Sequence, residues 1–98
     1  MRSEQETNRA LEKHADTVRR ICFVHLKNYH DTEDVFQEVF VKYLLHDAPF
    51  YSDEHERAWL VRVTINACKD TLKSFFKKNA KSLDDLASEL PVFEDRHR

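Results

Sequence analysis

The chain has 98 residues, 41% of them hydrophobic and 35% charged, which suits one compact soluble domain and is too short for two. It has no glycine and only two prolines, which argues against a β-rich fold because tight hairpins usually need residues at positive φ. Although the net charge is only −2, the chain has two regions of opposite charge. Residues 31–56 are acidic, with eight acids and one base, Lys42, and residues 61–81 are basic, with six Lys or Arg and one acid, Asp70. We expect these two regions to have different partners.

Hydrophobic periodicity predicts a first helix over residues 4–27. Its apolar positions recur at alternating steps of four and three, so they form one core-facing seam. We expect the histidine in this seam to be packed in the core and not to act as a ligand or base. A break follows at residues 28–30. The seam comprises Leu11, Ala15, Val18, Cys22, His25 and Tyr29.

A second helix is predicted over residues 32–46, with Asp31 as its N-cap. Val35, Phe36, Val39, Phe40 and Tyr43 share one arc and should be core. The far side carries Asp34, Gln37, Glu38, Val41 and Leu45, with Leu44 at its margin. Apolar residues among carboxylates and an amide are typical of a docking site for another helix. The alternative is that Val41 and Leu45 pack under the N-terminal segment.

Residues 46–53 (HDAPFYSD) read as a loop that contains Pro49. We expect one of the two aromatic rings, Phe50 by preference, to anchor this loop to the core. The other ring, that of Tyr51, is then free to face a ligand. Asp53 and Glu56 resemble a capping box at the start of a third helix over residues 54–78. Its apolar arc is broad and includes Leu60, Val61, Val63, Thr64, Ile65, Ala67, Thr71, Leu72, Phe75 and Phe76.

The other face of the third helix carries the most informative pattern in the chain. Steps of four, three, four and four place five polar residues within roughly 80° of arc. Trp59 lies at the start of the same stripe, where it is either part of a base platform or an ordinary core residue. Cations alternating with an amide and an aromatic suit a nucleic-acid backbone with exposed bases beside it, whereas the alternative is a solvated helix face. The stripe comprises Arg62, Asn66, Lys69, Lys73 and Lys77.

After Asn79 the sequence predicts a short helix from Ser82 to about Leu90, ended by Pro91 and followed by a charged tail. The predicted fold is therefore all-α, a compact three-helix domain over residues 1–81 with a short C-terminal helix in residues 82–98. The tail reads as the beginning of an interdomain linker, and a naturally short protein is the alternative.

Several kinds of site are not indicated by the sequence. Cys22 and Cys68 lie on apolar helix faces without a CxxC motif, so we expect buried, reduced thiols, which fit a cytoplasmic location. The first 13 residues are too polar for a signal peptide, and no apolar run approaches membrane length. Because no metal cluster, matched nucleophile and base, or phosphate-binding glycine loop is visible, we expect no enzyme activity, metal or cofactor.

Two motifs in these helices resemble a known family. The strings are DTEDVFQEVFVKYL and AWLVRVTINACKDTLK, which contain D-x-x-Q-E-x-F and W-L-x-R-x-x-x-N-x-x-x-D. They are similar to the promoter-melting domain, region 2, of bacterial extracytoplasmic-function sigma factors, over roughly Leu11 to Lys78. The pair of motifs at this separation is far more specific than either alone. Nothing after Lys81 resembles the second sigma domain.

The resemblance implies a role in transcription initiation, with RNA polymerase and promoter DNA as partners. The first motif would contact the clamp helices of the polymerase β′ subunit through Asp34, Gln37 and Glu38, with apolar contact from Val41, Leu44 and Leu45. The second would face the non-template strand of the minus-ten element through Arg62, Asn66 and Lys69, with Lys73 and Lys77 extending the phosphate track. The loop with Phe50, Tyr51 and Ser52 resembles the segment that helps to hold an unstacked base, with Trp59 beside it. The resemblance also allows an anti-sigma factor as a regulatory partner.

One further departure from the family pattern and one rival interpretation accompany this hypothesis. Lys73 and Lys77 stand where the family often has arginine, so bidentate phosphate contacts are not expected there. The rival is a helical interaction module, such as an adaptor or a sigma-regulating protein, that uses the acidic helix while the basic stripe stays solvated. A steep salt dependence of DNA binding is required only by the sigma interpretation.

Overall fold

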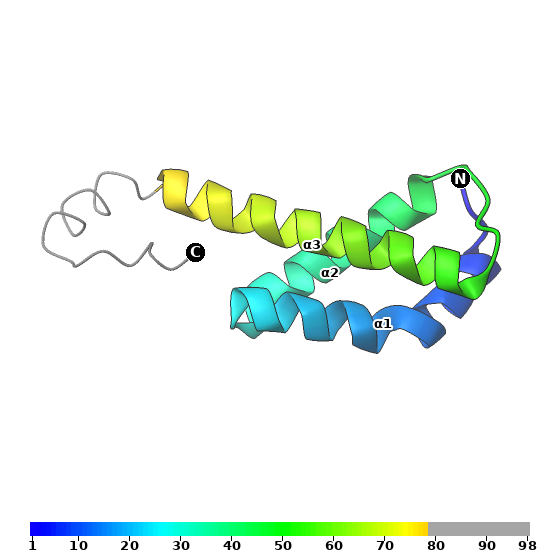
Figure 1. The fold of residues 1–98 in the computed structure, drawn as a ribbon, viewed down its shortest axis with the longest axis horizontal. Helices are drawn as coiled ribbons and strands as arrows, with labels where there is room; N and C mark the ends of the chain where they lie inside the picture. The colour runs from blue at the N-terminus through cyan, green and yellow to red at the C-terminus, as the bar shows by residue number, and fades with distance from the viewer. Residues whose placement is uncertain (79–98) are drawn as a thin grey trace, which may run out of the picture.

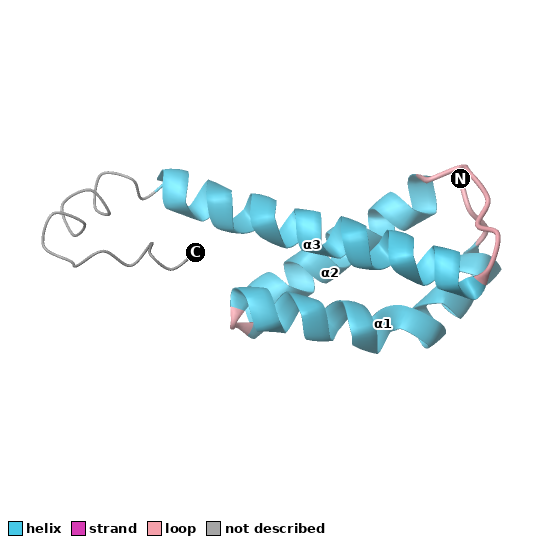
Figure 2. Cartoon of the chain, viewed as in Figure 1, coloured by secondary structure: helices cyan, strands magenta, loops and turns pink. Residues whose placement is uncertain are grey.

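The structure is a computed structural model that describes residues 1–78. It contains three helices, α1 (Glu4–Leu26), α2 (Tyr29–Leu45) and α3 (Asp53–Lys78), and no strand in this part of the chain. Figure 1 shows α1 and α2 joined by a tight turn, with the longer α3 lying across both of them. Within residues 1–78, loops are confined to the turn between α1 and α2, the N-terminal residues and the segment that joins α2 to α3 (Figure 2). The expected three-helix, all-α fold is confirmed, and the expected helix at residues 82–90 lies outside the described residues.

The turn between α1 and α2 is tighter than predicted, because Asn28 and not Asp31 caps α2. Lys27 adopts a left-handed conformation with φ 62°, and its N–H donates to the Phe23 carbonyl at 2.8 Å. Asn28 is extended, and its Oδ1 accepts from the Asp31 N–H at 2.8 Å. The second helix therefore begins three residues earlier than the sequence indicated.

The start of α3 is capped by Ser52, one residue before the predicted cap. Ser52 Oγ accepts from the His55 N–H at 3.1 Å, and the ring of His55 accepts from the Tyr51 N–H through Nδ1 at 3.0 Å. This arrangement resembles a capping box, except that the histidine at N3 accepts from the N–H of Tyr51, the residue before the N-cap, and not from that of Ser52. The result ties the last residues of the loop to the first turn of α3.

The core lies between the three helices and follows the predicted arcs of α2 closely. All five predicted α2 core residues are buried, and α3 contributes Leu60, Thr64, Ala67 and Cys68. On α1 the buried residues recur at steps of four, and they end at Leu26. The predicted seam was wrong at His25 and Tyr29, which are exposed, because each step of four turns the buried stripe by about 40° around the helix. The buried α1 residues are Ala10, His14, Val18, Cys22 and Leu26.

The prediction for the C-terminal half of α3 was wrong in one respect. Phe75 and Phe76 were expected in the apolar arc, but their exposed fractions are 55% and 52%. Figure 1 shows that the last turns of α3 project beyond the ends of α1 and α2, so neither of these two helices covers them. Leu72 is the last residue of α3 that packs against the core.

Candidate functional site

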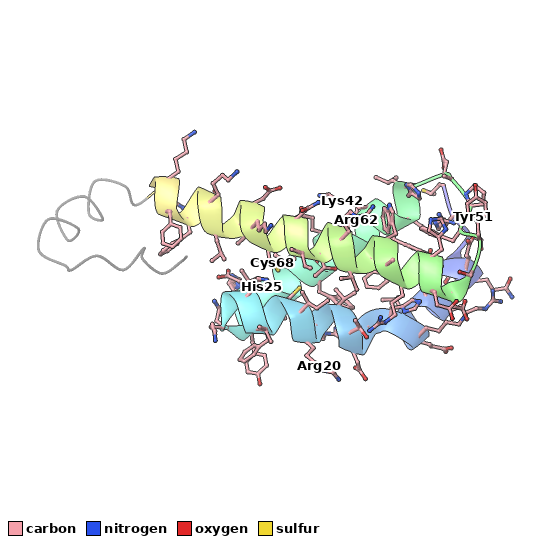
Figure 3. The ribbon with its side chains drawn as sticks, viewed as in Figure 1. Arg20, His25, Lys42, Tyr51, Arg62 and Cys68 are labelled. Carbon is pink, nitrogen blue, oxygen red and sulfur yellow. The ribbon has the colours of Figure 1, made fainter. Side chains whose placement is uncertain are left out.

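The basic stripe of α3 is fully available at the surface. All five stripe residues are exposed, and none of their side chains forms a hydrogen bond or ion pair with another residue in the described range 1–78. Figure 3 shows Arg62 on α3, well away from the α1 side of the bundle where Arg20 lies. Four cations without a counterion among residues 1–78 give this face a positive potential along roughly four turns of helix. The stripe residues are Arg62, Asn66, Lys69, Lys73 and Lys77.

An aromatic cluster lies at the N-terminal end of this stripe. Phe50 is half-buried and stacks on Tyr43, with ring centroids 6.0 Å apart and an interplanar angle of 6°. Trp59 contacts Phe50 at 5.6 Å and His46 at 4.6 Å, one turn before Arg62. The expectation that Phe50 anchors the loop is confirmed. Trp59 is half-buried against the core, so its role as a core residue is confirmed, although part of its ring remains exposed beside the loop.

Tyr51 is the one ring of this loop that faces solvent (Figure 3). Its exposed fraction is 88%, and it stacks on His55 with the centroids 5.1 Å apart and an interplanar angle of 9°. The neighbouring Ser52 is also exposed, but its hydroxyl is already engaged in capping α3. Tyr51 is therefore held in a defined orientation while one of its faces stays open.

A polar cavity of about 440 Å³ opens between the loop and the N-terminal segment. Two of its four carboxylates are held by exposed ion pairs, Asp47 with the N-terminal amine and Asp53 with Lys13, both at 2.8 Å. These partners hold the pKa of both carboxyl groups below the ordinary value. The cavity is consequently rich in ionised acceptors at neutral pH. It is lined by Arg2, Glu6, Asp47, Pro49, Phe50, Ser52, Asp53 and Glu56.

Arg2 holds the loop in place, which the sequence analysis did not foresee. Its guanidinium lies 4.6 Å from the centroid of Phe50 and 4.7 Å from that of Tyr43. It donates to the Tyr43 carbonyl at 3.1 Å and to the Ala48 carbonyl at 2.6 Å, and it pairs with Glu6 at 2.8 Å. The sequence contains no signal for this role, because the position reads only as part of a polar N-terminus.

A buried network joins all three helices beneath the loop. Tyr43 Oη donates to Glu56 Oε2 at 2.7 Å, and His14 Nε2 lies 3.0 Å from Glu56 Oε1. Tyr43 is completely buried and His14 nearly so. Glu56 was expected only as a capping residue, whereas here its carboxylate satisfies one buried donor from α1 and one from α2.

The acidic face of α2 is exposed, which decides between the two interpretations that the sequence left open. Val41 and Leu45 have exposed fractions of 53% and 61%, which excludes the alternative that they pack under the N-terminal segment. That segment instead reaches α2 through the Arg2 N–H, which donates to the Leu44 carbonyl at 2.9 Å. The face is composed of Asp34, Gln37, Glu38, Val41 and Leu45, which are exposed, and Leu44, which is half-buried.

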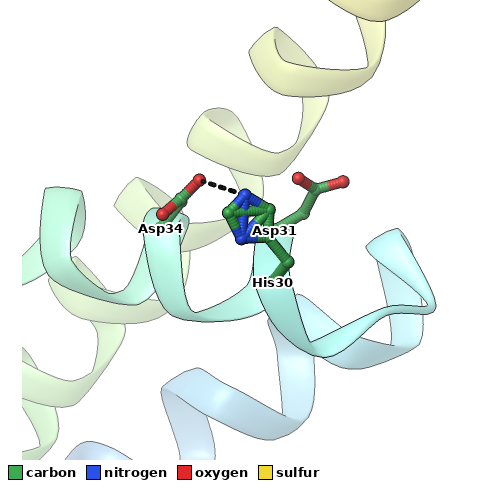
Figure 4. Close-up of side chains that lie close together, drawn as sticks. All are labelled: His30, Asp31 and Asp34. Carbon is green, nitrogen blue, oxygen red and sulfur yellow. Dashed lines mark ion pairs between the residues drawn. The ribbon is translucent and has the colours of Figure 1, made fainter.

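The residues that could hold a metal ion lie in the first turns of α2. His30, Asp31 and Asp34 offer ligand atoms within 4.8 Å of one another, and His30 Nε2 lies 3.7 Å from Asp34 Oδ2 (Figure 4). Asp31 also accepts from Asn28 Nδ2 at 2.9 Å. Asp31 lies in the first turn of α2, where capping and the helix dipole account for an acid, and Asp34 and His30 are exposed one turn apart on the same helix. We therefore assign no metal site to this surface cluster.

The fold and these surfaces define a small helical domain with a free basic face, an aromatic loop and a separate acidic face. The family model for sigma-70 region 2 matches residues 10–78, which is more than half of the chain. The chain therefore belongs to the sigma-70 region 2 family, whose members are non-enzymatic domains of transcription initiation. No curated protein and no solved structure gives a significant match to the chain. No helix among residues 1–78 is long and apolar enough to cross a membrane.

Proposed function

We propose that this chain recognises and melts the minus-ten element of promoters as region 2 of an extracytoplasmic-function sigma factor, while it is bound to RNA polymerase in the cytoplasm. The observation that carries the proposal is the free stripe of α3 directly beside the aromatic loop, in a domain of this family. Melting requires no bond chemistry. A domain that binds flipped bases and the single strand more tightly than the duplex shifts the equilibrium toward the open form.

In this proposal the stripe residues divide into two roles. Arg62, Lys69, Lys73 and Lys77 contact phosphates of the non-template strand, which positions the strand without reading its sequence. Asn66 is the exception, because an amide both donates and accepts and can therefore pair with a base edge. Its place between Arg62 and Lys69 puts this amide within the phosphate track.

The loop and its cavity are proposed to hold an unstacked base. Phe50, Tyr51 and Trp59 supply aromatic surface near the cavity, and Ser52 lies on its rim. The carboxylates of the cavity repel phosphate but accept hydrogen bonds from exocyclic amino groups. A base, and not the backbone, is therefore the part of the strand that this cavity suits.

The DNA proposal is tested by comparing Asn66→Ala, Lys73→Ala and Lys78→Ala on matched and altered single strands at several salt concentrations. Asn66→Ala should reduce the preference between strands by about 1–3 kcal/mol, as expected for a lost bidentate contact. Lys73→Ala should weaken all strands alike and reduce the salt slope by about 0.7, the value for one phosphate of a single strand. Lys78 is the matched control, because it is exposed on the opposite side of the same helix.

Two results would contradict this division of roles. If Asn66→Ala and Lys73→Ala lose the same affinity on every strand, the stripe contacts the DNA only electrostatically and Asn66 does not read a base. A shallow salt slope for the unmodified protein would favour the second candidate function, a protein interaction module without DNA binding. The exposed apolar residues Val41 and Leu45 are the observation that favours this second candidate.

The acidic face of α2 is proposed to dock on the β′ clamp helices of RNA polymerase. Exposed Val41 and Leu45, surrounded by Asp34, Gln37 and Glu38, support a helix-docking surface with an apolar centre and a polar rim. An anti-sigma factor that competes with polymerase would use the same apolar residues.

The double substitution Gln37→Ala/Val41→Ala should weaken binding to core polymerase and leave the helical content unchanged, because both side chains are exposed. The double substitution Gln5→Ala/Val24→Ala removes the same two residue types from exposed positions on α1 and serves as the control. Equal affinities for the two double variants, measured by fluorescence with labelled protein, would remove α2 as the docking surface.

A further inference from the structure

A second cavity, with a volume of about 340 Å³, lies between the C-terminal half of α1 and the first turns of α2. All the residues that line this α1–α2 groove come from these two helices, so it is separate from the basic stripe of α3. Figure 3 shows Arg20, one of the lining residues, on the side of α1 that faces away from α3. The volume is within the range of small-molecule sites.

One wall of the groove is a fixed ion pair. The guanidinium of Arg19 donates through Nε to Glu33 Oε2 at 2.8 Å and through Nη2 to Glu33 Oε1 at 3.1 Å. It also lies 3.9 Å from the centroid of the Phe36 ring. Glu33 is the one carboxylate that lines the groove, and it is engaged by Arg19. The second lining guanidinium, that of Arg20, forms no hydrogen bond or ion pair with another residue of the described range.

The rest of the surface around the groove is apolar. The rings of Phe23 and Tyr29 lie 5.1 Å apart, and these two residues and Val24 line the groove and are exposed. Their exposed parts amount to roughly 300 Å². A stable protein–protein interface buries about 800 Å² on each partner, so this surface suits one small apolar group better than a partner helix.

Thr32 adds a hydrogen-bond donor to this apolar surface. Its side chain lines the groove and is only 2% exposed, and its Oγ1 has no hydrogen-bond partner among residues 1–78. Buried hydroxyl groups are nearly always paired, so this one needs an explanation. A ligand with an acceptor oxygen would satisfy the hydroxyl.

We propose that the α1–α2 groove binds a small carboxylic acid with an aromatic body. The body contacts Phe23 and Tyr29, and the carboxylate accepts hydrogen bonds from Arg20 and Thr32. A second copy of the chain is a poorer occupant, because the one carboxylate of its own groove is already engaged. The site does not rest on the function proposed above, since it contains no residue of the DNA-binding stripe or of the polymerase-docking face.

The test is a titration of the full nitrogen-15-labelled chain with 3-phenylpropionate, followed through its backbone amide resonances. The amides of Phe23, Val24, Tyr29 and Thr32 should shift and saturate, with a Kd of about 1–10 mM for a ligand of about eleven non-hydrogen atoms. 3-Phenylpropionamide keeps the ring and an acceptor oxygen but has no charge, so it should bind roughly two- to fivefold more weakly. Acetate, which lacks the ring, should leave these resonances unchanged.

Two variants separate the charge from the hydroxyl. Arg20→Gln should weaken 3-phenylpropionate roughly two- to fivefold and leave 3-phenylpropionamide unchanged, because only the charge is removed. Arg9→Gln is the matched control, because Arg9 is exposed on the same helix outside the groove. Thr32→Val replaces the hydroxyl by a methyl group and should weaken both ligands roughly two- to tenfold.

The outcomes decide between the occupants. Saturable shifts of the groove amides in the expected order of ligands would support the site, and no shifts at tenfold the expected Kd would overturn it. Equal weakening by Arg20→Gln and Arg9→Gln would show only a general electrostatic attraction and overturn the carboxylate assignment. Shifts of the same amides with protein concentration alone would place a second copy in the groove and overturn the small-molecule assignment.

Discussion

The buried hydrogen bond between Tyr43 and Glu56 is expected to be one of the main polar interactions that hold α2 against α3. Tyr43→Phe removes a single oxygen atom, so the stack with Phe50 can persist. The lost bond is 2.7 Å long and has a carboxylate acceptor. Hydrogen bonds to charged groups contribute about 1.5–3 kcal/mol, so we expect the free energy of unfolding to fall by about 2 kcal/mol. For a domain of this size that loss corresponds to roughly 8–16 °C in Tm.

Tyr51→Phe is the matched control, because it removes the same atom from a ring that is 88% exposed. We expect it to change the free energy of unfolding by no more than about 0.5 kcal/mol. The measurement is urea denaturation of the three proteins at pH 7, followed by far-UV circular dichroism. Equal shifts of the midpoint for the two variants would refute the reasoning.

The same hydrogen bond predicts that the free energy of unfolding depends on pH. Burial and the hydrogen bond to Glu56 raise the pKa of Tyr43 above the ordinary value of 10.0, so folding favours the neutral phenol. The stabilisation is complete below the pKa of the unfolded chain, and it is lost as the pH rises toward the higher pKa of the folded state. Between pH 9 and pH 11, about one unit either side of the ordinary tyrosine pKa, the unmodified protein should therefore lose stability faster than Tyr43→Phe. Parallel curves would contradict this assignment.

Two further predictions concern buried groups. Arg2→Lys should lower the free energy of unfolding by about 2–3 kcal/mol, because a lysine lacks the planar fork with which arginine donates to the Tyr43 and Ala48 carbonyls at once. An unchanged urea midpoint would show that Arg2 does not hold the loop. Burial raises the pKa of both cysteine thiols, that of Cys22 to about 12. We therefore expect that iodoacetamide at pH 8 alkylates neither Cys22 nor Cys68 until urea unfolds the chain. Rapid labelling without urea would contradict the burial.

Sequence alone was sufficient for the existence of the three helices and for the residues that share each face of α2 and α3. The apolar arc of α2 and the stripe of α3 follow from a period of 3.6 residues, which is a property of each helix by itself. The exposure of Val41 and Leu45 was left open by the sequence and was decided by the structure. The family motifs lie on these same helices, so the family match agrees with the prediction. The thiols of Cys22 and Cys68 were likewise expected to be buried, and they are.

Only the tertiary structure decided how much of each helix is covered by the other helices and which side chains contact one another beneath the loop. His14 and not His25 is buried, because the crossing of the helices determines which side of α1 is enclosed. Phe76 is exposed because α3 is longer than the helices on which it packs, and relative length is not a local property. Arg2 and Glu56 reach their partners across 41 and 42 residues of chain, a separation at which periodicity carries no information. Local rules therefore determined the helices and their faces, and long-range packing determined the loop that the helices support.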